Sequence, residues 1–234
     1  MPLRKIAVAI VLSIGLSAAG AASAGVSGSV AIVSDYLFRG VTQTNGKPAL
    51  QGGVSWTHDS GFHVGTWGSS ISWLSDSDPD ISSQVELDVF LGYAGSFGDS
   101  AVGYDVGLNY YAYPGDYPAG FNRADTVELF FGVSWKFLGA RYWVATTDLF
   151  GIDDSNGSTN LDLSATWEFS PGWSGTAAFG KQWISGSSGA EDYTFWKIGV
   201  DKSFDNGFAI GGSWNSNDLG GVDDSFVLAV SKSF

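Results

Sequence analysis

Apolar and polar residues alternate along most of the chain from Val26 onward. Alternation with a period of two residues indicates β-strands that have one apolar face and one polar face. The clearest run places its apolar residues on one face: Val127, Leu129, Phe131, Val133, Trp135 and Phe137. We count about 12 such runs, near 26–39, 48–58, 62–73, 82–94, 101–113, 124–137, 141–150, 159–169, 173–184, 193–204, 208–216 and 225–234. Totals of 10 or 14 strands stay open. The alternation is weaker near 62–73, 141–150 and 173–184, so which residues of these runs face inward is open.

The connections between these runs alternate in length. Tight turns are predicted at 59–61, 138–140, 170–172 and 205–207, where Gly, Asn, Asp and Pro are frequent. Longer polar connections are predicted at 40–47, 74–81, 114–123, 151–158, 185–192 and 217–224. Short turns at one rim and long loops at the other are typical of an up-and-down antiparallel barrel in a bacterial outer membrane. An even number of strands places both termini at the short-turn rim, which is periplasmic in such barrels.

Alternation alone does not tell which face meets lipid, because a soluble sandwich would bury the same apolar face. Aromatic residues gather where the apolar face reaches the short turns, as a membrane-interface girdle does. The predicted girdle contains Trp56, Tyr93, Phe137, Phe169, Trp173, Phe204, Phe208 and Phe234. A second set lies toward the long loops: Tyr36, Phe38, Tyr110, Trp196, Trp214 and Phe226. We therefore predict an all-β transmembrane barrel in the outer membrane of a Gram-negative bacterium.

The first residues predict export. Met1 to Lys5 is a short basic start, Ile6 to Leu16 is apolar, and Ala22 to Ala24 has the small residues of a cleavage site. We expect a cleaved signal peptide over residues 1–24 and one barrel domain over residues 25–234. An uncleaved anchor is disfavoured, because a spanning helix needs about 20 apolar residues.

Charge and composition exclude several classes of protein. The formal net charge is −13, and loss of Arg4 and Lys5 with the signal makes it −15. Such an acidic chain repels nucleic acid. It has no cysteine, so disulfides and a cysteine nucleophile are excluded. The loop at Asp76 to Asp80 begins like a calcium loop but has Ile81 where the glycine belongs, so no metal site or cofactor is predicted.

Two resemblances support the barrel. The segments 34–40 (SDYLFRG), 48–53 (PALQGG), 60–62 (SGF) and 65–69 (GTWGS) resemble the TorF family of porins, a Gcw_chp-type family. This resemblance covers about the first third of the mature chain and implies an outer-membrane barrel with a transport role. The final strand ends at Phe234 and resembles the C-terminal signature that barrel-assembly machinery recognises. The implied partners are this machinery, outer-membrane lipid and lipopolysaccharide; the transported solute is open.

The polar faces supply candidates for pore-lining residues. Asp35 and Arg39 share the polar face of the first predicted strand, about 13 Å apart, so each needs a partner on a neighbouring strand. The other candidates are Glu86, Asp88, Asp105, Glu128, Lys136, Asp162, Glu168, Lys181, Lys197 and Asp201. Carboxylates outnumber cations, so an aqueous path would favour cations or neutral solutes. A lumen salt-bridge network that braces the barrel is the alternative role. Inward glycines, among them Gly92 and Gly107, are expected to widen the path.

Catalysis is not expected. Barrel hydrolases need a nucleophile beside a base, and the two histidines, His58 and His63, flank the predicted periplasmic turn at 59–61. The sequence predicts a narrow diffusion channel, and about 12 strands leave room for one but not for a wide channel. The alternative is a structural or adhesive barrel with a closed lumen and acidic ligand-binding loops.

Overall fold

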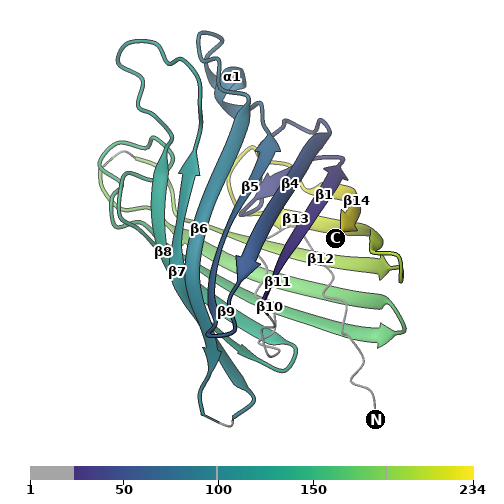
Figure 1. The fold of residues 1–234 in the computed structure, drawn as a ribbon. Coiled ribbons are helices and arrows are strands. Elements are labelled where there is room, and N and C mark those ends of the chain that lie inside the picture. The colour runs from purple at the N-terminus through teal and green to yellow at the C-terminus, as the bar shows by residue number, and fades with distance from the viewer. Residues whose placement is uncertain (1–23, 99, 188) are drawn as a thin grey trace, which may run out of the picture.

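A computed structural model describes residues 24–234 except residues 99 and 188. The predicted signal segment lies outside the described residues, apart from its last residue, Ala24. Within the described part, twelve antiparallel strands close into one barrel, as predicted, in the order β1-β14-β13-β12-β11-β10-β9-β8-β7-β6-β5-β4 (Figure 1). The ring is closed where β1 pairs with β14 at one side and with β4 at the other.

Most of the strand bounds follow the predicted runs to within a few residues. The barrel consists of β1 (Gly25–Val33), β4 (Ala49–Thr57), β5 (Phe62–Ser70), β6 (Val85–Ser96), β7 (Val102–Ala112), β8 (Thr126–Trp135), β9 (Leu138–Ala145), β10 (Thr159–Ser170), β11 (Trp173–Trp183), β12 (Tyr193–Ser203), β13 (Phe208–Asn217) and β14 (Ser225–Ser233). A two-stranded hairpin, β2 (Leu37–Phe38) and β3 (Val41–Thr42), lies between β1 and β4. The short helix α1 (Trp73–Ser77) follows β5.

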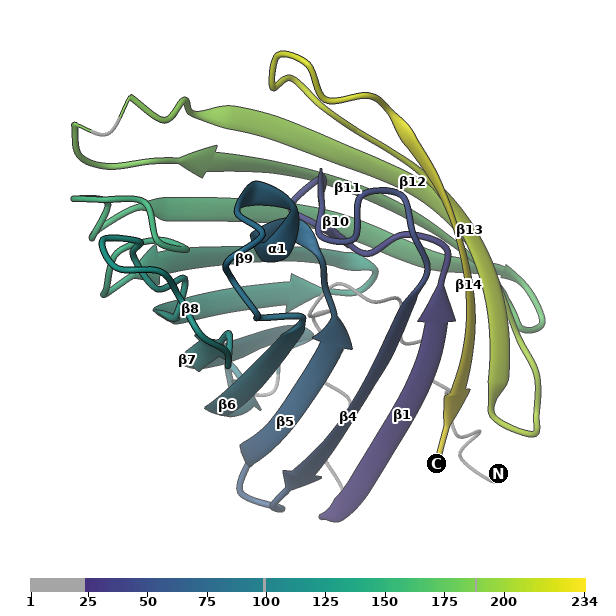
Figure 2. The same ribbon diagram turned by 90° about the horizontal axis from the view of Figure 1, so that it is seen from above.

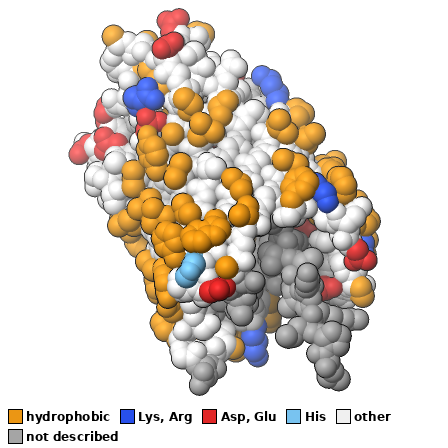
Figure 3. All heavy atoms as spheres, in the orientation of Figure 1, with side chains coloured by type: hydrophobic (Ala, Val, Ile, Leu, Met, Phe, Trp, Pro, Cys, Tyr) orange, Lys and Arg blue, Asp and Glu red, His pale blue; other side chains and the backbone are white. Residues whose placement is uncertain are grey.

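The outer face of the barrel is apolar although it is exposed. Along β6, Val85, Leu87, Val89, Leu91 and Tyr93 are 40–48 % exposed, while Glu86 and Asp88 between them are buried inside. Figure 3 shows hydrophobic side chains gathered on the wall of the barrel. Exposing so much apolar surface to water would be unfavourable, so this face is suited to lipid. Among the described residues, no helix has the length and apolarity to cross a membrane.

The eight predicted girdle residues all project outward, with exposures from 40 % at Trp56 to 75 % at Phe234. They lie beside the short turns at the end of the barrel opposite α1. Lys202 and Lys232 share this outer face, and their ammonium groups lie over the rings of Trp173 and Phe208 at 5.4 and 5.2 Å. From the second predicted set, Tyr110, Trp196, Trp214 and Phe226 also project outward.

One predicted turn and the predicted end of the first strand are wrong. The run 138–140 is not a turn, because β9 begins at Leu138; the chain reverses at Lys136, whose φ of 56° is left-handed. The first strand ends at Val33 rather than at residue 39, and the segment after it folds into the barrel. Tyr36 and Phe38 are therefore inside the barrel and belong to no outer girdle.

Candidate functional site in the barrel lumen

Residues 34–47, which we call the lumen hairpin, leave the wall after β1 and turn back before β4. Leu37 pairs with Thr42 and Phe38 with Val41, so the reversal is made by Arg39 and Gly40, both at positive φ (48° and 77°). Positive φ at both central residues is the geometry of the tightest hairpin turns, and glycine at the second position accommodates it without strain. Seen from above, the segment between β1 and β4 lies within the ring of strands (Figure 2).

Asp35 holds the base of the lumen hairpin. Its Oδ1 accepts hydrogen bonds from the hydroxyl groups of Thr42 and Thr44 at 2.6 and 2.8 Å. The Thr44 hydroxyl also accepts a bond from the backbone N–H of Tyr36. These bonds satisfy a buried carboxylate within the hairpin itself, so Asp35 shapes the loop rather than lining an open path.

The lumen hairpin contacts both sides of the barrel. The Tyr36 hydroxyl donates to Glu86 on β6 at 3.0 Å, and Arg39 Nη1 donates to Gln182 on β11 at 2.7 Å. A third contact comes from β13, where the side-chain amide of Asn217 donates to the carbonyl of Gly40 at 2.7 Å. Because β6, β11 and β13 lie in different parts of the ring, the hairpin crosses the lumen and narrows it.

Arg39 and Glu128 form the strongest contact of the hairpin. Two guanidinium nitrogens face the two carboxylate oxygens, at 2.7 Å for Nη2–Oε2 and 3.0 Å for Nη1–Oε1. The side chains are 5 % and 0 % exposed, so both charges depend on each other for compensation. Arg39 was predicted to lie on the polar face of the first strand, which is wrong, because it lies at the tip of the lumen hairpin. The prediction that it needs a partner from another strand is confirmed by Glu128.

Aromatic packing fills the space beside this ion pair. The ring of Phe38 lies edge-on to those of Tyr111 and Phe150, with centroids 5.8 and 5.4 Å apart. Tyr111 belongs to a buried cluster at the long-loop end that also contains Leu74 of α1 and Ile81. The barrel thus has a packed core at this end, built from inward strand residues such as Tyr111 together with residues of the hairpin and the long loops.

A second ion pair lies further toward the short turns. Arg141 of β9 donates to Asp105 of β7 at 2.6 Å, and the other oxygen of Asp105 is 3.5 Å from Nε2 of His63. Sequence reasoning missed Arg141. Had the preceding turn been placed at Lys136, the alternation in β9 would have set Leu138 and Tyr142 outward and Arg141 and Trp143 inward, as the structure does.

The other carboxylates differ in their surroundings. Asp88 is buried on the inner face of β6; its Oδ2 accepts a bond from Asn109 at 3.2 Å, and its Oδ1 has no hydrogen-bond partner among the described residues. Asp162 accepts a bond from the indole of Trp143 at 2.9 Å. Lys197 and Asp201 lie on the inner face of β12.

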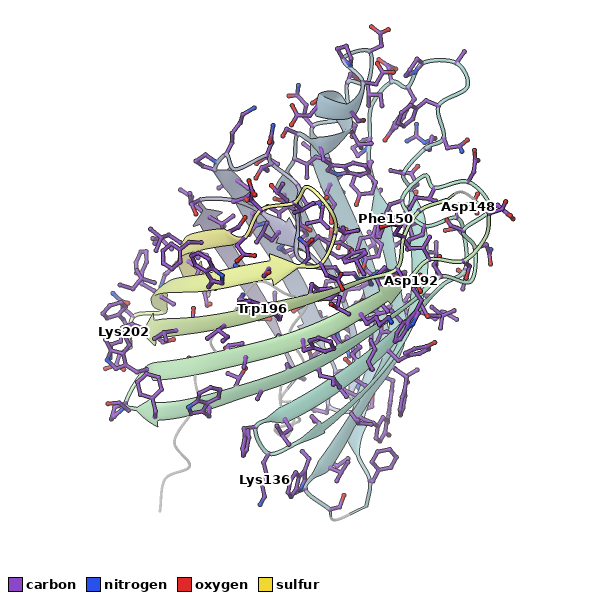
Figure 4. All side chains as sticks on the ribbon, turned by 180° about the vertical axis from the view of Figure 1, so that it is seen from behind. Lys136, Asp148, Phe150, Asp192, Trp196 and Lys202 are labelled. Carbon is purple, nitrogen blue, oxygen red and sulfur yellow. The ribbon has the colours of Figure 1, made fainter. Side chains whose placement is uncertain are left out.

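Three predicted pore-lining residues do not line the lumen interior. Lys136 lies in the turn between β8 and β9, at the opposite end of the barrel from Asp148 (Figure 4). Lys181 shares the outward face of β11 with Phe179, because the inward positions are the buried Gly180 and Gln182. Glu168 lies at the short-turn rim, where its Oε1 accepts the backbone N–H of Gly172.

The inward glycines do not widen the lumen as predicted. A Cβ on Gly92 would lie 2.7 Å from the imidazole of His63, and a Cβ on Gly107 would lie 2.7 Å from the ring of Phe130. The space that each glycine leaves is occupied by a ring from a neighbouring strand. The inner wall is consequently packed at these positions rather than hollowed.

The lumen keeps an acidic excess after pairing. The inward carboxylates are Asp35, Glu86, Asp88, Asp105, Glu128, Asp162 and Asp201. The inward side chains that carry a full positive charge, in the described part of the chain, are Arg39, Arg141 and Lys197. Two of these cations are committed to Glu128 and Asp105. An ion that enters the lumen therefore meets a negative field.

Comparisons with known proteins agree with this fold. The model of a family described as "Bacterial protein of unknown function (Gcw_chp)" matches residues 17–229. The structure is similar to the KdgM porin, with a TM-score of 0.55 and 10 % identity over 89 % of this chain and 98 % of that one. It is also similar to the COG4313 outer membrane channel from Pseudomonas putida, with a TM-score of 0.54 and 14 % identity over 94 % of this chain and 99 % of that one. No curated protein matches the sequence. At these identities the likeness shows the fold, and the TorF name stays a prediction.

Proposed function

The chain belongs to the Gcw_chp family of bacterial proteins of unknown function, and we propose that it is an outer-membrane channel for small cations or neutral solutes. The observation that carries this proposal is the acidic lumen crossed by the lumen hairpin. A solute must pass beside the hairpin or displace it, which limits the channel to small solutes. The carboxylates that have no cation as a partner would repel anions.

The setting of the channel is part of this proposal. The apolar outer face and the rings beside the short turns suit a bilayer that includes lipopolysaccharide in its outer leaflet. β1 begins and β14 ends at the short-turn rim, so both termini would be periplasmic. The exposed Phe234 at the end of β14 is available to barrel-assembly machinery.

Planar-bilayer conductance of the purified, refolded protein under a salt gradient tests the channel. We expect small discrete steps and a reversal potential that indicates cation preference. Asp162→Asn and Asp201→Asn should move the reversal potential toward zero, because each removes an inward negative charge. Asp80→Asn is the matched control, since Asp80 is an exposed loop carboxylate near α1. Its reversal potential should stay close to that of the unmodified protein.

Two results would reject the proposal. Anion preference would contradict the role of the lumen carboxylates. A folded barrel that gives no conductance steps would favour the rival function, a closed barrel with ligand-binding loops. The contacts of the lumen hairpin with opposite parts of the barrel wall also support this rival. Gel electrophoresis of unheated and heated samples distinguishes the folded barrel from the unfolded protein, because the two migrate differently. This check prevents a protein that has failed to fold from being mistaken for a closed channel.

A further inference from the structure

A cavity of about 190 Å³ lies between the lumen hairpin and the long loops. Five aromatic residues contribute to its wall: Phe38, Trp73, Tyr113, Phe150 and Tyr193. Aliphatic side chains from the connections that follow β9 and β11, including Ile152 and Ile184, complete it. The cavity is bounded on one side by Phe38 and Arg39, so anything bound in it touches the tip of the constriction.

The lining offers little to a charged or strongly polar molecule. The guanidinium of Arg39 already donates to Glu128 and Gln182. The amide of Gln182 donates to the carbonyls of Thr159 and Trp183. The indole Nε1 of Trp73 has no hydrogen-bond partner within the described part of the chain, but protein atoms enclose it, so it offers no donor to a molecule in the cavity. A small cavity with an apolar lining suits a small uncharged ligand with an apolar body.

The rim of the cavity is acidic. Asp148 precedes Leu149 and Phe150, and Asp192 precedes Tyr193; Figure 4 places Asp148, Phe150 and Asp192 together at the long-loop end. Asp218 lies near this rim, where hydrogen bonds from the backbone and hydroxyl of Thr194 hold its pKa below the usual range. These carboxylates disfavour an anion that approaches from outside.

We propose that this cavity binds a neutral solute of one ring, the size of a phenol. An apolar protein cavity of about 150 Å³ is large enough to hold benzene, so a phenol fits the volume found here. The ring would pack against Phe38 and Phe150. The inference rests on the proposed function in one respect: the bound molecule would be a solute that the channel admits from outside.

Fluorine NMR of 4-fluorophenol with the folded protein in detergent tests the binding directly. We expect a saturable shift that is lost in Ile152→Trp and in Ile184→Trp, because a larger side chain fills the cavity. Ile198→Trp is the matched control, since Ile198 is 59 % exposed on the outer face. It should bind as the unmodified protein does.

Other results would overturn the inference. Equal shifts in the unmodified protein and in both cavity-filling variants would mean that the probe enters only the detergent. Saturable binding of benzoate, glucose or tetramethylammonium in place of 4-fluorophenol would contradict the neutral one-ring class. Because binding is read at equilibrium, a protein that binds 4-fluorophenol but gives no conductance steps would refute the channel and keep the cavity site. Conductance steps in a protein that does not bind 4-fluorophenol would refute the cavity site and keep the channel.

Discussion

Replacing Glu128 with Ala is expected to lower the free energy of unfolding by about 3–5 kcal/mol, because it leaves the buried Arg39 guanidinium without its counter-charge. Both side chains are almost fully enclosed, at 5 % and 0 % exposure, so water cannot compensate for the lost carboxylate. Urea unfolding of the barrel in phospholipid vesicles, followed by tryptophan fluorescence, measures the change. The freed hairpin should also give larger conductance steps.

Two controls separate this ion pair from ordinary loss of contacts. The double variant Arg39→Met, Glu128→Leu should recover most of the stability, because no unpaired charge remains in the lumen. Arg123→Ala breaks an ion pair with Asp125 in which Arg123 is 50 % exposed, and a change of about 0–1 kcal/mol is expected there. A Glu128→Ala variant no less stable than Arg123→Ala would show that the pair does not hold the hairpin.

Replacing Leu91 with Arg is expected to cost about 2–4 kcal/mol in a bilayer, because a charge would face hydrocarbon. Leu91 lies in the middle of β6, between Val64 and Leu108 on the adjacent strands, and is already 40 % exposed. On a water-soluble barrel, a substitution at such an exposed position would change stability by about 0.5 kcal/mol or less. A wall that faces lipid and a wall that faces water therefore predict different losses of stability for Leu91→Arg.

The same vesicle unfolding assay measures this effect. Phe121→Arg is the control, since Phe121 is 37 % exposed in the long loop between β7 and β8 and would stay in water. The lipid-facing assignment of the outer wall would be untenable if Leu91→Arg were as stable as Phe121→Arg. A loss at Leu91 alone would support it.

The barrel strands could be predicted because the environment of each strand is reflected in the alternation of neighbouring residues. Each strand has one face in lipid and one inside, so the alternation of residues such as Leu87, Asp88 and Val89 reports the strand directly. The turn at Lys136 was less accessible, because a lysine at positive φ has no strong sequence signal. With the turn placed at 138–140, the facing of the run that follows stayed open, and Arg141 was not chosen as an inward residue.

The lumen hairpin was not predictable from alternation. Tyr36 and Phe38 continue an alternating pattern after β1, so they were assigned to the wall and to the outer aromatic set at the long-loop end. Their actual position depends on partners far along the chain, such as Glu86 and Glu128, which no local pattern reveals. Acidic excess in the lumen could be anticipated from composition, but the pairing of Arg39 could not.

The hairpin also constrains the order of assembly. Its tip is bonded to Asn217, which is 177 residues away from Gly40, and to Gln182, which is 143 residues away from Arg39. Contacts of such long sequence separation form late, after the entropy of closing large loops has been lost. The seam between β1 and β14 must then join around a hairpin that is already enclosed or entering. Because the partners on β11 and β13 must be in place first, we expect the hairpin to dock together with closure of the seam or after it.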